Sequence, residues 1–255
     1  MFGRLLKFEL RRLLKKRKLL LLGTVAVIAL IGGVVHYLGY STPRRTVSEA
    51  FSFATDLIFP LLLPLLAGIA TGDILAEDTE SGLLPLIFSR GVTSLQYVLA
   101  KVVTGVIGQV CFVAGVLVIF AATLTPFFPS GPILTYAVDF AQDLAINNPW
   151  AYCLAMSLIY SLAAIAFASI ALLVSVWVTN TFAVMVAPTV IYLATVYALG
   201  MDTPSKISFN PYGNLALGQF CGLPFTLPQI AVYWLIVATI TSALTVLAFS
   251  LKRKW

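Results

Sequence analysis

Charged residues are scarce in this chain, and their scarcity excludes most classes of soluble protein. Only 10% of the 255 residues are Asp, Glu, Lys or Arg, 60% are apolar or aromatic, and the mean hydropathy is +0.99. A soluble domain carries about 25% charged residues, because polar groups must cover much of its surface. The composition therefore excludes a soluble enzyme, a disordered chain and a small disulfide-bonded secreted domain. It predicts a polytopic membrane protein.

Residue types that bind metals or act as nucleophiles are also rare. The single histidine, His36, excludes His-based metal clusters. The three cysteines form no CxxC pair and lie in apolar stretches typical of ordinary buried thiols: Cys111, Cys153 and Cys221. The sequence contains no HExxH, GxSxG or GxxxxGK[ST] motif. We therefore predict no metal site, no catalytic residue and no ATP hydrolysis by this chain itself.

Long apolar runs are what the sequence has instead. A membrane-spanning helix needs about 20 such residues, and six runs qualify: 19–40, 51–72, 97–123, 150–178, 181–200 and 228–251. The predicted fold class is an all-α membrane protein with six transmembrane helices in one domain, residues 19–255. Three connections of that domain are long enough to carry structure of their own: a polar segment at 73–96, a Pro-rich loop at 125–149 and two short helices at 205–227.

The N-terminal segment, residues 1–18, is basic and amphipathic. Leu and Phe recur at helical spacing on one face and Arg and Lys on another, which is typical of a helix lying in the membrane interface. A signal peptide is the alternative, but no small-residue cleavage pattern ends the following apolar run. Four residues of this segment are predicted to contact anionic lipid headgroups: Arg11, Arg12, Lys15 and Lys16.

Basic residues are divided unequally between the two sides that six spans would create. The side holding both termini carries 13 of the 16 Lys and Arg residues, and the other side carries Arg44, Arg45 and Lys206. The positive-inside rule therefore predicts that both termini are cytoplasmic. The net charge of +6 then indicates membrane topology and lipid contact, and we expect no nucleic-acid partner.

The connection at 73–96 is the most acidic part of the chain, although it falls on the basic side. Four carboxylates occur within eight residues: Asp73, Glu77, Asp78 and Glu80. Gly82 then allows a sharp turn, and Pro85 suits the first turn of a short apolar helix. Such a segment fits a docking surface for a partner with basic residues and an apolar groove. A solvated loop whose carboxylates balance nearby Lys and Arg is the alternative.

This connection resembles the region between the second and third helices of ABC-2-type permeases, the membrane subunits of ATP-binding-cassette exporters. That region reads roughly E-x-x-E-x-G-T-L, followed by two leucines, an S-P-V turn and a Gly-Lys pair. The residues at matching spacing are Glu77, Glu80, Gly82 and Leu84, with Ser89-Arg90-Gly91-Val92 at the turn and Ala100-Lys101 at the pair. The departures are Leu83 in place of Thr, Pro85 early in the helix and Arg90 in place of Pro.

Other features agree with this resemblance. The family has an interfacial helix before its first span, often with a Phe/Glu/Arg pattern, which here corresponds to Phe8, Glu9, Arg11 and Arg12. It also has six spans with cytoplasmic ends, a tight turn between the fourth and fifth spans, and short outer helices before the sixth. The resemblance covers the whole chain in architecture and about 30 residues in motif.

The resemblance implies a permease subunit of an ATP-driven exporter in the cytoplasmic membrane of a prokaryote. The permease would work as a dimer, with a second copy or a related permease, and would dock two separate ATPase chains. ATP and Mg²⁺ would bind those chains, and this chain would bind no cofactor. Its predicted docking residues comprise three carboxylates, a turn glycine and an apolar plug: Glu77, Asp78, Glu80, Gly82, Leu84, Leu86, Ile87 and Phe88.

The substrate path is predicted less sharply. The candidates are aromatic residues of the spans together with one carboxylate: Phe53, Asp56, Phe59, Tyr192 and Tyr197. Asp56 either lines the path or reaches water near the outer interface. Two other functions stay open, a membrane anchor or sensor that recruits a cytoplasmic partner and an ion-coupled secondary transporter. The poverty of polar residues within the spans argues against the second and favours a hydrophobic or amphipathic cargo.

Overall fold

The structure is a computed structural model that describes residues 2–14, 17–39, 46–129, 144, 147–199, 211, 214–215 and 227–252. Within these ranges, all regular secondary structure is helical. The elements are α1 (Phe2–Leu14), α2 (Arg17–Leu38), α3 (Val47–Thr71), α4 (Asp73–Glu80), α5 (Leu83–Ser89), α6 (Ser94–Gln109), the π-helical turn η1 (Val110–Ala114), α7 (Gly115–Leu124), α9 (Pro149–Ser175), α10 (Thr181–Leu199) and α11 (Leu227–Lys252).

Five helical stretches are long and apolar enough to cross a membrane: Val47–Glu80, Ser94–Leu124, Pro149–Ser175, Thr181–Leu199 and Leu227–Lys252. This confirms the prediction of an all-α, multi-pass membrane protein. Residues Leu22–Leu38 of α2 form a shorter apolar helix, so the sixth span stays a prediction. The short helices expected at 205–227 and the Pro-rich loop expected at 125–149 fall largely outside the described residues.

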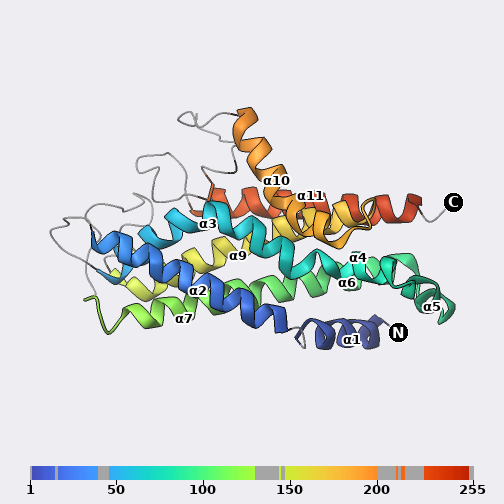
Figure 1. The fold of residues 1–255 in the computed structure, drawn as a ribbon, viewed down its shortest axis with the longest axis horizontal. Coiled ribbons are helices and arrows are strands. Elements are labelled where there is room, and N and C mark those ends of the chain that lie inside the picture. Colours follow the sequence, from blue (N-terminus) through green and yellow to red (C-terminus); the bar gives the residue numbers. More distant parts are fainter. Residues whose placement is uncertain are drawn as a thin grey trace.

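Helices α2, α3, α6, α7, α9 and α11 run side by side along the long axis of the molecule, whereas α10 slants away from it (Figure 1). Helix α9 packs against α3, α6, α7, α10 and α11. Many of its buried residues are small, including Ala163, Ala164 and Ser169. Between helices in lipid there is little hydrophobic driving force, so close van der Waals packing of small residues has to hold them together.

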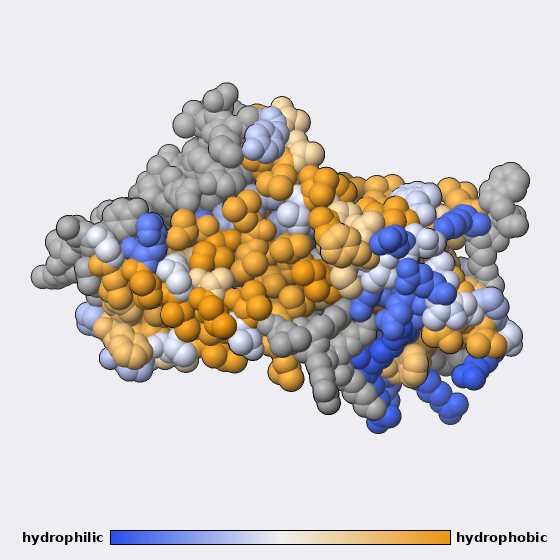
Figure 2. Space-filling view, in the orientation of Figure 1, coloured by the Kyte–Doolittle hydropathy of each residue, from blue (hydrophilic) through white to orange (hydrophobic). Residues whose placement is uncertain are grey.

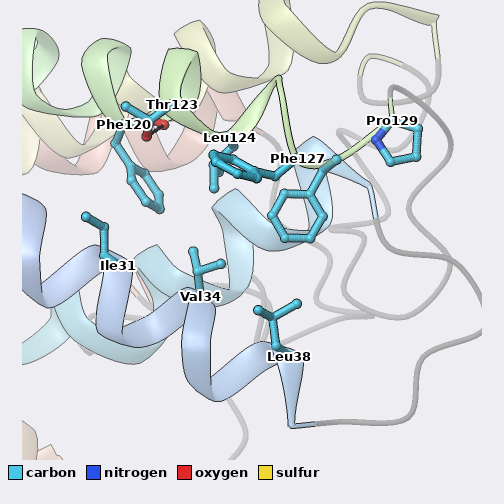
Figure 3. Close-up of a pocket in the computed structure, with 9 residues that line it drawn as sticks. Ile31, Val34, Leu38, Phe120, Thr123, Leu124, Phe127 and Pro129 are labelled. Carbon is cyan, nitrogen blue, oxygen red and sulfur yellow. Dashed lines mark hydrogen bonds between the residues drawn. The ribbon is translucent and has the colours of Figure 1, made fainter.

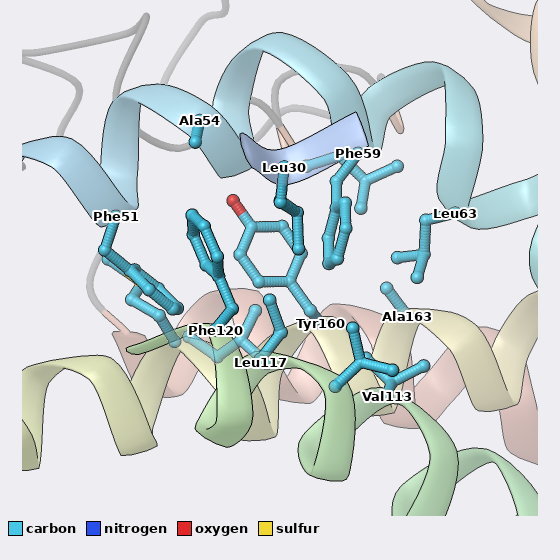
Figure 4. Packing of buried hydrophobic residues seen from close by; sticks show 14 of the residues in the cluster. Leu30, Phe51, Ala54, Phe59, Leu63, Val113, Leu117, Phe120, Tyr160 and Ala163 are labelled. Carbon is cyan, nitrogen blue, oxygen red and sulfur yellow. The ribbon is translucent and has the colours of Figure 1, made fainter. Parts of the chain in front are cut away.

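The bundle core is built from interlocking aromatic and aliphatic side chains. Figure 4 shows Phe51, Phe59 and Leu63 of α3 facing Leu117 and Phe120 of α7. The ring of Tyr160 from α9 lies among them, edge-on to Phe59 with the ring centroids 5.0 Å apart. These residues come from helices far apart in the sequence, so this packing fixes how the spans are arranged.

Polar and apolar surfaces separate along the long axis. Figure 2 shows apolar side chains over the middle of the molecule and hydrophilic ones gathered at one end. That end, called the polar end below, contains α1, α4, α5 and the last turns of α9 and α11, where the Lys252 ammonium donates a hydrogen bond to the Val176 carbonyl at 2.6 Å. The 34 residues of α3 and α4 would extend about 51 Å, against about 30 Å of hydrocarbon. Helix α4 therefore protrudes from the lipid or forces the span to tilt.

Helices α3 and α10 approach each other closely enough for their backbones to touch. A Cβ atom on Gly68 would lie 2.0 Å from the Met185 carbonyl oxygen, and one on Gly72 would lie 3.1 Å from the Met185 Cα. Glycine is therefore required at Gly68 for this contact. The contact lies just before α4, so it anchors the segment that leads to the polar end.

Candidate functional site

Helix α5 is delimited by two glycines at the polar end. Gly82 has φ of 68° and Gly91 has φ of 77°, a left-handed conformation that other residues rarely adopt. The first turns the chain from α4 into α5, and the second turns it back towards α6. Thr93 then starts α6 with a capping box, in which its hydroxyl and the Gln96 side chain each accept from the other residue's backbone N–H. The result is a seven-residue helix at the tip of the polar end (Figure 1).

Beneath α5 lies a group of charged side chains from three helices. This charge cluster consists of Glu9 and Arg12 of α1, Glu77 and Asp78 of α4, and Lys101 of α6. The Asp78 side chain has no exposed surface, and it pairs with both Arg12 and Lys101. The Tyr97 hydroxyl donates a third hydrogen bond to its Oδ2 at 2.7 Å. A buried carboxylate needs such partners, because an unpaired charge away from water is very costly.

Lys101 connects α6 to the other two helices of the cluster. Its side chain is 1% exposed, and its ammonium lies 2.8 Å from Glu9 Oε1. The same ammonium pairs with Asp78 and donates to the Ile74 carbonyl at 2.9 Å. The ammonium of Lys101 thus donates to Glu9 on α1 and to Ile74 and Asp78 on two successive turns of α4. The cluster holds α1 against the spans as part of the folded bundle.

Arg12 lies at the edge of the cluster, where its side chain is 20% exposed. It pairs with Asp78 and, through Nη2, with Glu77 Oε2 at 2.9 Å. Burial by itself lowers the pKa of Arg12, but the hydrogen bond and attraction of Asp78, aided by Glu77 and Glu9, outweigh burial and raise that pKa above its ordinary value. Arg12 therefore stays charged. It serves an internal contact, whereas the sequence predicted a contact with lipid headgroups.

Tyr97 also connects the charge cluster to α5 through its ring. The Phe88 ring of α5 lies edge-on to it with centroids 5.6 Å apart, and the Phe249 ring of α11 lies 5.7 Å away. The Lys101 ammonium stands 5.2 Å from the centre of the same ring. Aromatic pairs of this kind contribute about 0.5–1.5 kcal/mol beyond the area that they bury. One side chain thus contacts α5, α4, α6 and α11.

The predicted docking residues divide into an inner and an outer set. Asp78 is inside, and three apolar residues of α5 pack partly against the cluster around Tyr97: Leu84, Ile87 and Phe88. The outer set is exposed and comprises Glu77, Glu80, Gly82 and Leu86. Leu83, which was not among the predicted docking residues, is exposed beside them, and the docking face below consists of Glu77, Glu80, Leu83 and Leu86. Leu86 is 60% exposed. Glu80 accepts a hydrogen bond from the Thr181 hydroxyl of α10 at 2.9 Å.

The other sequence-predicted residues that the structure describes belong neither to the charge cluster nor to the docking face. Arg11 is exposed on α1, whereas Lys15 and Lys16 lie outside the described residues. Four of the five candidate path residues belong to the helix packing. Phe53 lies 5.4 Å from the Tyr37 ring, Phe59 is buried against Tyr160, and Tyr192 is buried edge-on to Phe167.

Asp56 and Tyr197 show opposite environments among the path candidates. Asp56 is 5% exposed and accepts a hydrogen bond from the Tyr160 hydroxyl at 3.0 Å. Tyr197, near the end of α10, is 81% exposed. The structure therefore does not bring the five candidates together as one surface.

Sequence reasoning overlooked two buried charged residues, Lys101 at the polar end and Glu49 at the opposite end, where α3 begins. The sequence predicted Lys101 only as a basic residue of the cytoplasmic side and as part of the Ala100-Lys101 pair, although it is the fifth residue of the expected third span. A charge at that depth signals a buried partner, and Asp78 and Glu9 prove to be the partners. Glu49, in the first turn of α3, was also missed. It is fully buried, and neither of its carboxylate oxygens has a hydrogen-bond partner within the described part of the chain.

Comparison with protein-family models and with characterised proteins gives no match. The function is therefore inferred from the geometry of the polar end.

Proposed function

We propose that this chain is the transmembrane permease subunit of an ATP-driven exporter of the ABC-2 type. In this proposal the docking face binds a cytoplasmic ATPase subunit. The proposal rests on one observation. The exposed, partly apolar docking face is connected to the membrane-spanning helices by buried ring contacts and ion pairs. A permease that senses closure of its ATPase needs such a firm connection between its docking site and its membrane helices.

The docking face has the chemistry that such a partner requires. Leu83 and Leu86 offer apolar side chains at the tip, and Glu77 and Glu80 offer exposed carboxylates beside them. Apolar anchors rimmed by charges are the usual composition of a protein interface. The complementary surface on the ATPase would be an apolar groove bordered by Arg or Lys.

Movement of the docking face would reach the bundle by two routes. Phe88 and Tyr97 connect α5 to α6 and α11 through ring contacts. Asp78 and Lys101 connect α4 to α1 and α6 through ion pairs. Asp78 thus supports the docking face from below, and we assign it a positioning role.

The remaining parts of the proposal concern topology and assembly. Six spans with both termini in the cytoplasm would place the polar end inside the cell, which agrees with its basic residues. A six-helix subunit would form half of a translocation path, so a second copy or a related permease completes it. Two ATPase chains would bind ATP and Mg²⁺. The membrane would be the cytoplasmic membrane of a prokaryote. A hydrophobic or amphipathic cargo fits the apolar spans.

Affinity purification of the tagged full-length chain in mild detergent, followed by mass spectrometry, tests this function. We expect a stoichiometric partner that carries a GxxxxGK[ST] loop. Leu86→Asp should abolish its recovery, whereas Leu251→Asp should not. Leu251 is the matched control, because it is 61% exposed at the polar end but lies on α11. Recovery of a different cytoplasmic protein through the same face would instead establish a membrane anchor or sensor. Equal recovery of the ATPase with both variants would disprove the docking assignment.

A further inference from the structure

A hollow lies on the inner side of α5, between this helix and the polar ends of α9 and α11. It has a volume of about 170 Å³ and is called the rear pocket below. Its lining residues are Leu84 and Phe88 of α5, Phe249 and Lys252 of α11 and Thr79 of α4, with Ser175 and Val176 at the end of α9. A group bound there would contact α5 and two membrane-spanning helices at the same time.

The walls of the rear pocket suit an aromatic group. The rings of Phe88 and Phe249 have centroids 6.5 Å apart, and both rings pack on Tyr97, which holds them in place. The hydroxyls of Thr79 and Ser175 donate to carbonyls of their own helices, at 3.2 and 2.6 Å, and therefore add little polarity. A guest ring can meet these two rings edge-on or offset, which are the arrangements that aromatic pairs prefer.

The volume of the rear pocket matches one ring. An engineered cavity of about 150 Å³ lined by Leu, Ile and Phe binds benzene. The rear pocket, at about 170 Å³, therefore has room for one phenyl ring. A single turn of helix, 5.4 Å high and about 10 Å across, would fill roughly 400 Å³. The pocket thus fits one side chain of a partner and excludes a whole helix.

A cation at the rim distinguishes the rear pocket from the larger hollow between α2 and α7. In that hollow Ile31 and Val34 face Phe120, and no charged side chain lines it (Figure 3). The rear pocket is lined by Lys252, which is exposed and whose ammonium donates to the Val176 carbonyl at 2.6 Å. An ammonium has three N–H groups, so Lys252 can hold an anion at the rim as well.

The charge at the rear pocket is opposite in sign to that of the docking face. Glu77 and Glu80 on the docking face call for basic residues on a partner, whereas Lys252 calls for a carboxylate. Interfaces arrange charges in this complementary way to fix the register of two proteins. A partner that meets both surfaces would therefore bind α5 in one orientation.

We propose that the rear pocket receives one aromatic side chain of the ATPase subunit, with a neighbouring Asp or Glu of that subunit paired to Lys252. This inference rests on the proposed function, in which the ATPase subunit docks on α5. Aromatic side chains seated in pockets are common anchors of protein interfaces. An anchor here would hold α5 from its inner side and would also contact Phe249. Movement of the ATPase would then reach α11 without passing through Tyr97.

Recovery of the ATPase with the tagged full-length chain in mild detergent, measured per tagged chain, tests the rear pocket. Thr79→Phe puts a ring of the chain itself into the pocket and should reduce recovery at least fivefold. Ser250→Phe is the matched control, because Ser250 is exposed on α11 and does not line the pocket. Lys252→Gln should reduce recovery at least threefold. Lys7→Gln, which removes the same charge from the exposed side of α1, should leave recovery unchanged.

The wild type separates failure of this inference from failure of the proposed function. If the wild-type chain recovers no ATPase, the proposed function is wrong, and the inference is wrong with it. If the wild type, Thr79→Phe and Lys252→Gln all recover the ATPase equally, docking is supported and only the assignment of the rear pocket is overturned.

A small probe, 4-fluorobenzoate, carries a ring and a carboxylate in one molecule and tests the pocket without a partner. Its fluorine NMR signal should broaden with the wild type and with Ser250→Phe in the same detergent. The broadening should be at least fivefold smaller with Thr79→Phe and with Lys252→Gln. Addition of the ATPase to the wild type should displace the probe.

Three outcomes of these measurements would assign the pocket differently. Equal broadening with all four proteins would show that the pocket does not bind an aromatic carboxylate. Broadening that appears only after residues 253–255 are removed would overturn the proposal and would assign the pocket to Trp255 of the chain itself. A co-purified lipid that Thr79→Phe releases, with unchanged recovery of the ATPase, would also overturn it and would assign the pocket to lipid.

Discussion

Replacing Lys101 by methionine leaves two buried carboxylates of the charge cluster without the cation that they share. Glu9, which is 2% exposed, loses its ion pair 2.8 Å away, and Asp78 keeps only Arg12 and Tyr97. Removing one partner of a buried ion pair typically costs about 3–5 kcal/mol, because the other charge stays buried. We therefore expect Lys101→Met to lower the free energy of unfolding by about that amount.

Thermal unfolding of the purified protein in detergent measures this loss. For a domain of this size, 1 kcal/mol corresponds to about 2–4 °C, so the midpoint should fall by roughly 6–20 °C. The double variant Glu9→Gln/Lys101→Met should lose less stability than the sum of the two single variants, by about 0.5–3 kcal/mol. Each single change leaves the other residue as a buried charge without its ion-pair partner, whereas the double change does not. If Lys101→Met stays within about 0.5 kcal/mol of the wild type, or if the two changes are additive, the cluster does not hold α1 in place.

Three further predictions use the same unfolding measurement. Tyr97→Phe removes the hydrogen bond to Asp78 and should cost about 1–3 kcal/mol, whereas Tyr97→Ala also removes the ring contacts and should cost about 3–5 kcal/mol; equal losses would mean that the rings contribute nothing. Gly68→Ala should lower the free energy of unfolding by about 1–3 kcal/mol, because its Cβ would collide with the Met185 carbonyl. Gly32→Ala is the control and should cost nothing, because a Cβ there has no neighbour within 4 Å. Equal free energies of unfolding for the two variants would contradict the close contact of α3 and α10. Tyr160→Phe should lower the free energy of unfolding by about 1–3 kcal/mol, because it removes the hydroxyl that donates to Asp56. An unchanged free energy of unfolding would show that this hydrogen bond does not stabilise the fold.

The positions of the five described spans along the chain could be predicted from the sequence, because lipid imposes one simple condition. Each span must be apolar over about 20 residues, so its length and position follow from hydropathy alone. The expected span at 150–178 corresponds to α9, and that at 228–251 corresponds to α11, within three residues at each boundary. The end of the second span was harder to place. Helix continues through Gly72 into α4, because the acidic residues after it find partners on α1 and α6.

The roles of individual charges could not be read in this way. Asp78 and Glu80 are two positions apart in one acidic segment, yet Asp78 is buried and Glu80 is exposed. Their difference depends on which side of α4 faces α1 and α6, and hydropathy carries no information about neighbouring helices. Arg12 was likewise assigned to lipid because its helix is basic, whereas Asp78 and Glu77 hold it within the protein. Pairing partners are a property of the tertiary fold.

The short length of α5 explains why the buried residues matter to any partner of the docking face. A seven-residue helix is not stable by itself in water, because isolated helices need about 12–15 residues. Its helical conformation must therefore be stabilised by the turns at Gly82 and Gly91 and by the packing of the Phe88 ring against Tyr97. Tyr97 is fully buried and cannot touch a partner. Loss of its ring should nevertheless weaken partner recovery as strongly as Leu86→Asp, since the partner would meet Leu86 on a helix without a fixed position.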